Sequence, residues 1–175
     1  MLRSWASCAP SLFALLTSFH GISHAVEPAW RALSGAPTDS RIDDVFFLNE
    51  SMGWTFCNGV AYRTLDGGER WQSFPAPGMS MRSITFTTPS HGWIGSLNPM
   101  TPLWATVDSG KTWSTVPLPD PKPQGVCGLW SVSPNVVYGC GRYSGPAVVI
   151  KTTDGGAHWG TLDMSALATT LVDCR

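Results

Sequence analysis

Charged side chains are scarce in this sequence, and neither sign dominates. Lys, Arg, Asp and Glu make up 13% of the 175 residues, and 11 basic residues stand against 12 acidic ones, for a formal net charge of −1 at pH 7. Proteins that bind nucleic acid or lie on anionic membranes carry a basic surplus or a basic cluster. The balance therefore predicts that nucleic acid is not a partner of this protein.

The sequence also lacks the motifs of common catalytic and cofactor sites. Gly-x-Ser-x-Gly, His-Glu-x-x-His, a phosphate-binding loop and Cys-x-x-Cys are all absent. Beyond the first 25 residues there are only two histidines, His91 and His158. We therefore predict no catalytic residues, no cofactor and no metal site.

No apolar run is long enough to cross a membrane. Ser11–Phe19 is apolar but short, it follows the positive start Met1–Arg3, and it precedes the small residues of Ser23–Ala25. This order is typical of a secretory signal peptide, so residues 1–25 are predicted to be removed before Val26. The mature chain is then exported without membrane insertion, to the periplasm or the extracellular space, or to a lumen in a photosynthetic organism. The alternatives are an uncleaved anchor and a chance apolar run.

Sustained helical periodicity is missing after this leader, and a repeated phrase stands in its place. Thr-x-Asp-x-Gly-x-x-Trp occurs three times, and its aspartates are 42 and 46 residues apart. A period in the forties indicates a repeat architecture. The repeated residues are Thr64, Asp66, Gly68, Trp71, Thr106, Asp108, Gly110, Trp113, Thr152, Asp154, Gly156 and Trp159.

The chemistry of this phrase is that of a tight turn. The Asp and Thr side chains can accept hydrogen bonds from the turn backbone, and Gly adopts a conformation that is costly for other residues. The Trp is predicted to be buried under the hairpin. Because equivalent residues of successive repeats are spread over a structure, the three aspartates are not expected to form one catalytic centre.

Each phrase closes a unit of four short predicted strands. The units cover roughly residues 41–76, 82–118 and 125–164, and turn signals separate the strands within them. Trp30–Leu33 has the pattern of a fourth strand and is predicted to close the ring. Residues 168–175 are predicted to start a further unit.

The phrase resembles the Asp-box, or BNR repeat, of sialidases, sortilin-like receptors and the photosystem II stability/assembly-factor family. There it is the turn between the third and fourth strands of a β-propeller blade. The resemblance implies an all-β propeller of four-stranded antiparallel blades, with about three blades present. We expect residues 26–175 to be the N-terminal part of a larger propeller of 6–8 blades. The alternative is a natural three-blade protein that closes by oligomerising.

Within this group, the element Phe-x-x-x-x-x-Gly-Trp before the turn looks most like the photosystem II stability/assembly-factor family. That resemblance implies an exported, non-enzymatic propeller that binds protein partners during assembly or stabilisation of a complex. The alternative is a fragment of a sialidase-like or other glycoside hydrolase with its catalytic residues in missing blades. Of the aromatic-Arg-Ile-Pro phrase that opens sialidases, Ser40–Asp43 keeps only Arg41 and Ile42.

Four cysteines follow the leader, and an even number in an exported chain suggests disulfides. They are Cys57, Cys127, Cys140 and Cys174, which allow three pairings. Cys127 and Cys140 flank a turn signal between two apolar runs, and we favour a disulfide between them. The alternative is that the four thiols are buried and act as small apolar groups.

Overall fold

The computed structural model describes residues 32–38, 41–78, 80–141 and 146–174. They belong to one compact unit, Ala32–Arg175. The predicted signal peptide lies outside the described residues, as do Trp30 and Arg31 of the predicted closing strand. The described part contains twelve strands and no helix.

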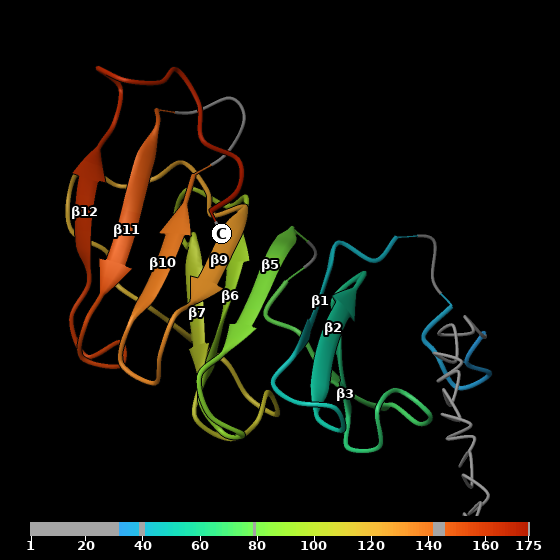
Figure 1. Cartoon of the computed structure of the whole chain (residues 1–175). Helices are drawn as coiled ribbons and strands as arrows, with labels where there is room; N and C mark the ends of the chain where they lie inside the picture. The colour runs from blue at the N-terminus through green and yellow to red at the C-terminus, as the bar shows by residue number, and fades with distance from the viewer. Residues whose placement is uncertain (1–31, 39–40, 79, 142–145, 175) are drawn as a thin grey trace, which may run out of the picture. The chain divides into compact units, whose positions relative to one another are not determined.

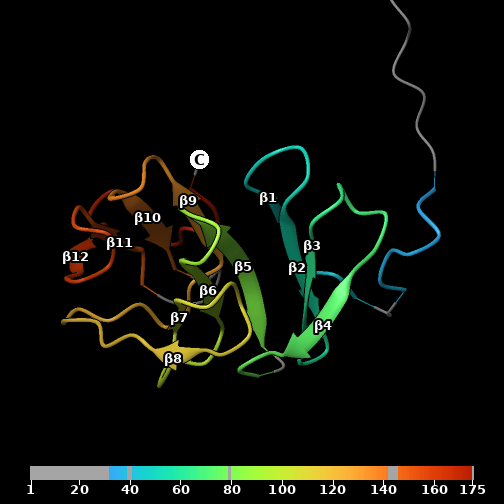
Figure 2. The same cartoon turned by 90° about the horizontal axis from the view of Figure 1, so that it is seen from below.

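The twelve strands form three antiparallel sheets in which each strand pairs with its neighbour in sequence (Figure 1). The first sheet consists of β1 (Asp44–Phe47), β2 (Gly53–Cys57), β3 (Val60–Thr64) and β4 (Gln72–Pro75). The second consists of β5 (Met81–Phe86), β6 (Gly92–Ser96), β7 (Leu103–Thr106) and β8 (Ser114–Thr115). The third consists of β9 (Gly128–Ser131), β10 (Val137–Cys140), β11 (Val148–Thr152) and β12 (Gly160–Asp163). Figure 2 shows β4 and β8 at the outer edges of their sheets.

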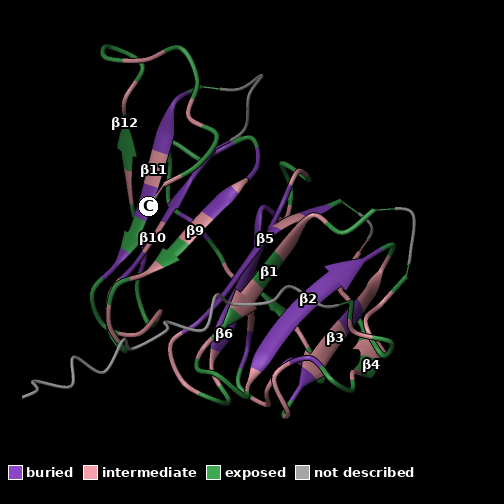
Figure 3. Ribbon diagram, turned by 45° about the vertical axis from the view of Figure 1, so that its right-hand side comes forward, coloured by how far each residue is buried: buried purple, intermediate pink, exposed green. Residues whose placement is uncertain are grey.

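Two apolar cores lie where neighbouring sheets meet. The first sheet contributes Trp54 and Phe56 to one core, and the second sheet contributes Met81, Ile84, Phe86 and Ile94. The other core joins the second and third sheets, and its buried members are Trp93, Leu103, Leu118, Val126, Val137, Val148, Ile150 and Trp159. The second strands are therefore the most protected: β2 and β6 are buried along their whole length (Figure 3). No sheet can bury its apolar residues without its neighbour.

The spacing of the Phe-x-x-x-x-x-Gly-Trp element follows from the pairing of the first two strands. Phe47 pairs with Gly53 in the first sheet, and Phe86 pairs with Gly92 in the second. A Cβ atom at Gly53 would lie 2.7 Å from the ring of Phe47, so the ring occupies the place of a side chain. The same overlap arises between Gly92 and Phe86. The glycine thus makes room for the aromatic ring across the ladder.

The ends of the described chain differ from the sequence-based expectation. Ala32 and Leu33 form no strand, and neither do residues 168–174, which were predicted to start a further unit. Instead, residues 173 and 174 pass directly over Gly128 in β9. Backbone packed across a face of a sheet has no ladder of N–H and C=O groups to join, so it remains irregular.

Candidate functional site

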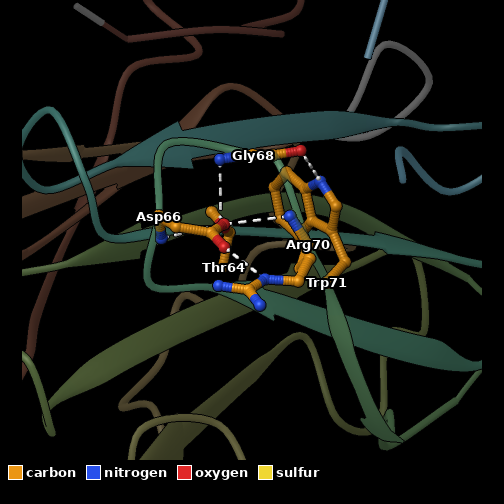
Figure 4. Close-up of polar contacts among 5 residues, drawn as sticks. All are labelled: Thr64, Asp66, Gly68, Arg70 and Trp71. Atoms are coloured by element: carbon orange, nitrogen blue, oxygen red, sulfur yellow. Dashed lines mark hydrogen bonds and ion pairs between the residues drawn. The ribbon is translucent and has the colours of Figure 1, made fainter. Parts of the chain in front are cut away.

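Each Thr-x-Asp-x-Gly-x-x-Trp turn is closed by the same hydrogen bonds of its Thr and Asp, shown for the first turn in Figure 4. The Thr64 hydroxyl donates to Asp66 Oδ1 at 2.9 Å and accepts from the Gly68 N–H at 2.8 Å. Asp66 also accepts from the Arg70 backbone N–H at 2.9 Å and from Arg70 Nε at 2.8 Å. Trp71 Nε1 donates to the Gly68 carbonyl at 2.9 Å. The side chains of the repeat are therefore used to hold the turn.

The other two turns repeat the Thr and Asp contacts with a different residue in the place of Arg70, but Trp113 Nε1 and Trp159 Nε1 have no hydrogen-bond partner among the described residues. Thr112 donates to Asp108 through its backbone N–H at 2.9 Å and through its hydroxyl at 2.6 Å. His158 donates its backbone N–H to Asp154 at 2.9 Å, and its Nδ1 lies 2.7 Å from the second carboxylate oxygen. Both oxygens of all three carboxylates are thus engaged within their own turns.

These contacts lower the pKa of all three aspartates from 3.8 to about 2. For Asp66 the largest cause is the hydrogen bond from the Arg70 side chain. For Asp108, burial acts to raise the pKa, but the hydrogen bonds led by Thr112 outweigh it. For Asp154 the His158 backbone N–H contributes most. A general acid needs a raised pKa, so the direction of these shifts fits a structural role.

The tryptophans of the turns are less buried than the sequence suggested. Trp159 is 8% exposed, but Trp71 and Trp113 are only half-buried, so the prediction that all three are buried is wrong for these two. The reason is that each ring packs on the glycine of its own turn at the outer edge of the sheet, close to Gly68 and Gly110 respectively. The other side of the ring stays partly open to solvent.

The tryptophans of the second strands have the role that was expected of the turn tryptophans. Trp54 is 1% exposed and Trp93 is fully buried. Trp54 reaches from the first sheet to the turn of the second, where its Nε1 donates to the Ser109 carbonyl at 3.0 Å. The ring of Trp93 lies in the same way against Gly156 in the turn of the third sheet, 2.7 Å from where a Cβ atom would be. The Gly-Trp pairs in the sequence were the signal for this contact.

A charged pocket of about 380 Å³ lies where the first strands of the three sheets begin. Asp43, with 12% of its side chain exposed, is held between two arginines. Its Oδ1 is 2.6 Å from Arg41 Nη2 and 3.4 Å from Arg82 Nη1. Asp44 beside it accepts from the Ile84 N–H at 3.0 Å and so connects β1 to β5. Val172 and Asp173, near the C-terminus, complete the wall.

A second, more apolar pocket of about 240 Å³ adjoins the first, because Asp44 and Leu129 line both. Its lining includes Phe47 and Trp130, each 43% exposed, and Val45, which is 55% exposed. We call the two pockets together the first-strand groove, since β1, β5 and β9 form most of its wall. Nothing in the sequence brought these segments together, because the groove depends on how the sheets pack.

The favoured disulfide between Cys127 and Cys140 is not formed. The two residues are neighbours, since the Cys127 N–H donates to the Cys140 carbonyl at 3.0 Å. However, Cys140 pairs with Gly128, the residue after Cys127, and Cys127 itself lies before β9. The two cysteines are therefore not directly paired in the ladder, and both remain thiols. The thiol of Cys140 makes a hydrogen bond with Cys174 instead.

The described residues show neither a metal-binding cluster nor a membrane-spanning helix. Among the residues that the structure describes, no group of three or more His, Cys, Asp and Glu side chains is placed to hold a metal ion. In the same residues, no helix is long and apolar enough to span a bilayer.

Comparison with known proteins places the fold. No protein-family profile and no curated protein matches the sequence. Among solved structures, YCF48 bound to a D1 peptide matches with a TM-score of 0.58 and 25% identity, over 73% of this chain. YCF48 from Cyanidioschyzon merolae matches with a TM-score of 0.54 and 25% identity, over 72% of this chain. The fold is a β-propeller. Each four-stranded sheet is a blade of it.

This chain matches only part of each of these longer proteins. The chain covers 41% of the YCF48 chain with the peptide and 38% of the Cyanidioschyzon merolae chain, so it spans less than half the length of either. An ancestral GH74 enzyme matches with a TM-score of 0.59, over 82% of this chain and 21% of the enzyme. The identity there is 14%, which supports the propeller fold and nothing about activity.

Proposed function

We propose that this chain is part of an exported, non-enzymatic propeller that binds a protein partner during the assembly or stabilisation of a complex. The YCF48 likeness supports this proposal, because one of those structures holds a D1 peptide. The sequence resemblance to the photosystem II stability/assembly-factor family points the same way. We also propose that the three turns are Asp-box repeats and that the leader directs export.

The first-strand groove is the proposed binding site for a segment of the partner. The observation that carries this proposal is the exposure of large apolar side chains along one groove: Val45 at 55%, and Phe47 and Trp130 at 43% each. Single exposed apolar side chains are common, but several gathered along one groove are typical of a binding site, and aromatic residues contribute much of the binding energy of interfaces.

The charged end of the groove gives the proposed site a polar anchor. Arg41 keeps 60% of its side chain exposed while its Nε and Nη2 hold Asp43. A guanidinium group has five N–H donors, so Arg41 can bind an incoming carboxylate or peptide carbonyl with those that remain. A peptide with an apolar side chain next to an acidic group fits this combination.

A glycoside hydrolase fragment is the alternative, and no feature of the groove favours it. Glycoside hydrolysis uses two carboxyl groups, one of them protonated near neutral pH. Asp43 is paired with two arginines, and Asp44 accepts backbone N–H groups of Val45 and Ile84. The aspartates of the turns are ionised and bound within their turns.

Fluorescence anisotropy with a labelled D1 peptide tests the proposal. We expect saturable binding, and we expect Trp130→Ala to weaken it at least about tenfold, which corresponds to about 1.4 kcal/mol. Leu162→Ala is the matched control, because Leu162 is 59% exposed on β12 and does not line the groove. Binding that Trp130→Ala leaves unchanged would exclude the groove. Turnover of fluorogenic glycosides that is lost on mutating Arg41 would exclude the non-enzymatic function.

A further inference from the structure

The C-terminal segment lies across a face of the third blade at a glycine. A Cβ atom on Gly128 would be 2.7 Å from Asp173 Cα and 2.8 Å from the backbone nitrogen of Cys174. No side chain fits there, so Gly128 provides the space in which the backbone of residues 173 and 174 lies. Figure 1 shows the chain end beside β9, close to β10.

Cys140 points to this same face of the sheet. It pairs with Gly128 across β9 and β10, and the side chains of directly paired residues in an antiparallel ladder lie on one face, with Cβ atoms about 4.5–5.5 Å apart. Cys140 is 1% exposed, so the residues that cover this face enclose its thiol. The backbone of Cys174 lies where the Gly128 side chain would be, which brings Cys174 next to Cys140.

We propose that Cys140 and Cys174 form a disulfide bond that ties the C-terminal segment to the third blade. The backbone of Cys174 lies against Gly128, the residue paired with Cys140, and the Cys174 side chain interacts with the Cys140 thiol. Cys127, whose backbone N–H donates to the Cys140 carbonyl, is the competing partner, which peptide mapping distinguishes. The proposal goes beyond the proposed function and does not depend on it.

The reaction is a thiol–disulfide exchange with a disulfide oxidant, either a small molecule such as glutathione disulfide or a protein of the export compartment. The Cys174 thiolate attacks one sulfur of the oxidant, forming a mixed disulfide and releasing one oxidant thiol. The Cys140 thiolate then attacks the Cys174 sulfur and releases the second thiol. Two protein thiols lose two electrons and two protons, and one oxidant disulfide gains both.

The surroundings of the two thiols set this order of attack. The hydrogen bond to Cys174, followed by burial, raises the pKa of the Cys140 thiol. Cys174 is only half-buried and so is the thiol that an oxidant can reach. The bond would fix the position of Val172 and Asp173, which form part of the wall of the first-strand groove.

Peptide mapping of the purified full chain after incubation with glutathione disulfide tests this pairing. Free thiols are alkylated with iodoacetamide, and the chain is cut with trypsin and chymotrypsin without reduction. Cleavage after Tyr138 and Arg142 separates Cys140 from Cys127, and cleavage after Leu171 leaves Cys174 in residues 172–175. We expect residues 139–142 joined to residues 172–175, and loss of this species on reduction.

Two variants complete the experiment. Cys174→Ser should abolish the cross-linked species and leave Cys140 without a disulfide, while Cys127→Ser should leave the species intact. Cys174 is the residue to replace because it is less buried than Cys140, so the substitution does not disturb the core. A fragment that joins Cys140 to Cys127, or complete alkylation of both Cys140 and Cys174 after oxidation, would overturn the proposal. The peptide map reports the disulfide alone, so its outcome is read independently of D1 peptide binding.

Discussion

The hydrogen bond between Trp54 and Ser109 can be measured, because the fold supplies an internal control. Trp54 and Trp93 occupy equivalent positions in the first and second blades, and each packs against the turn of the next blade. Trp54 Nε1 donates to the Ser109 carbonyl at 3.0 Å. Trp93 Nε1 is buried without a hydrogen-bond partner among the described residues. Replacing the indole by a phenyl ring removes one N–H group in each variant. The apolar surface lost is about the same at the two positions.

The difference between Trp54→Phe and Trp93→Phe should therefore report the hydrogen bond. The loss of ring area is common to both variants and cancels in the comparison. An intramolecular hydrogen bond of this kind stabilises the folded state by about 1 kcal/mol, and Trp54→Phe also leaves the Ser109 carbonyl without this donor. In Trp93→Phe the lost N–H group had no hydrogen bond to offset the cost of burying it, so its removal does not destabilise the folded state. Trp54→Phe should thus lower the free energy of unfolding by about 1–2 kcal/mol more than Trp93→Phe.

Urea denaturation followed by circular dichroism measures this difference. With a slope of about 2 kcal/mol per M urea, the midpoint of Trp54→Phe should lie about 0.5–1 M below that of Trp93→Phe. The slopes of the two variants should be equal, because the same surface is exposed on unfolding. Equal midpoints, or a lower midpoint for Trp93→Phe, would refute the argument that the contact between Trp54 and the second turn is an energetically significant link between blades.

Two further predictions concern the turns. Because the folded pKa of Asp108 is lowered from 3.8 to about 2, its contribution to stability is present above about pH 4 and is lost as the pH falls towards 2. Asp108→Asn should reduce this loss in acid denaturation, and an unchanged acid profile would contradict the role of its carboxylate. Gly156→Ala should lower the free energy of unfolding by about 1–3 kcal/mol more than Gly155→Ala, because both have positive φ but only Gly156 packs against Trp93. Thermal denaturation of the two variants compares them, and equal melting temperatures would show that the ring does not restrict this position.

The strands and turns could be predicted because they depend on neighbours in the sequence. The three turns gave the period, and Gly53 and Gly92 marked the start of the second strand in two blades. The all-β propeller predicted from these signals is confirmed. The conformation of a turn and the alternation of a strand are decided within a few residues, so one sequence is enough to show them.

What depends on packing between segments was harder to predict. The sequence did not distinguish Trp54, which is fully enclosed, from Trp71, which is half-buried, because the degree of burial depends on which neighbouring segment covers each ring. For the cysteines the error was one of strand register. The residue paired with Cys140 is Gly128 and not Cys127, a difference of one residue that the sequence pattern does not resolve.

The turn glycines show how a local repeat produces an extended architecture. Gly110 packs against Trp54, and Gly156 packs against Trp93, so each turn holds an aromatic side chain of the preceding blade. Gly68 in the first turn packs in the same way against Leu33, from the segment before the first blade. The glycine is therefore required for two reasons. It adopts the positive φ that the turn needs, and its lack of a side chain leaves room for the packed residue of the preceding segment. Each turn is thus completed by a residue from outside its own sheet, which links the turn chemistry to the packing between neighbouring segments.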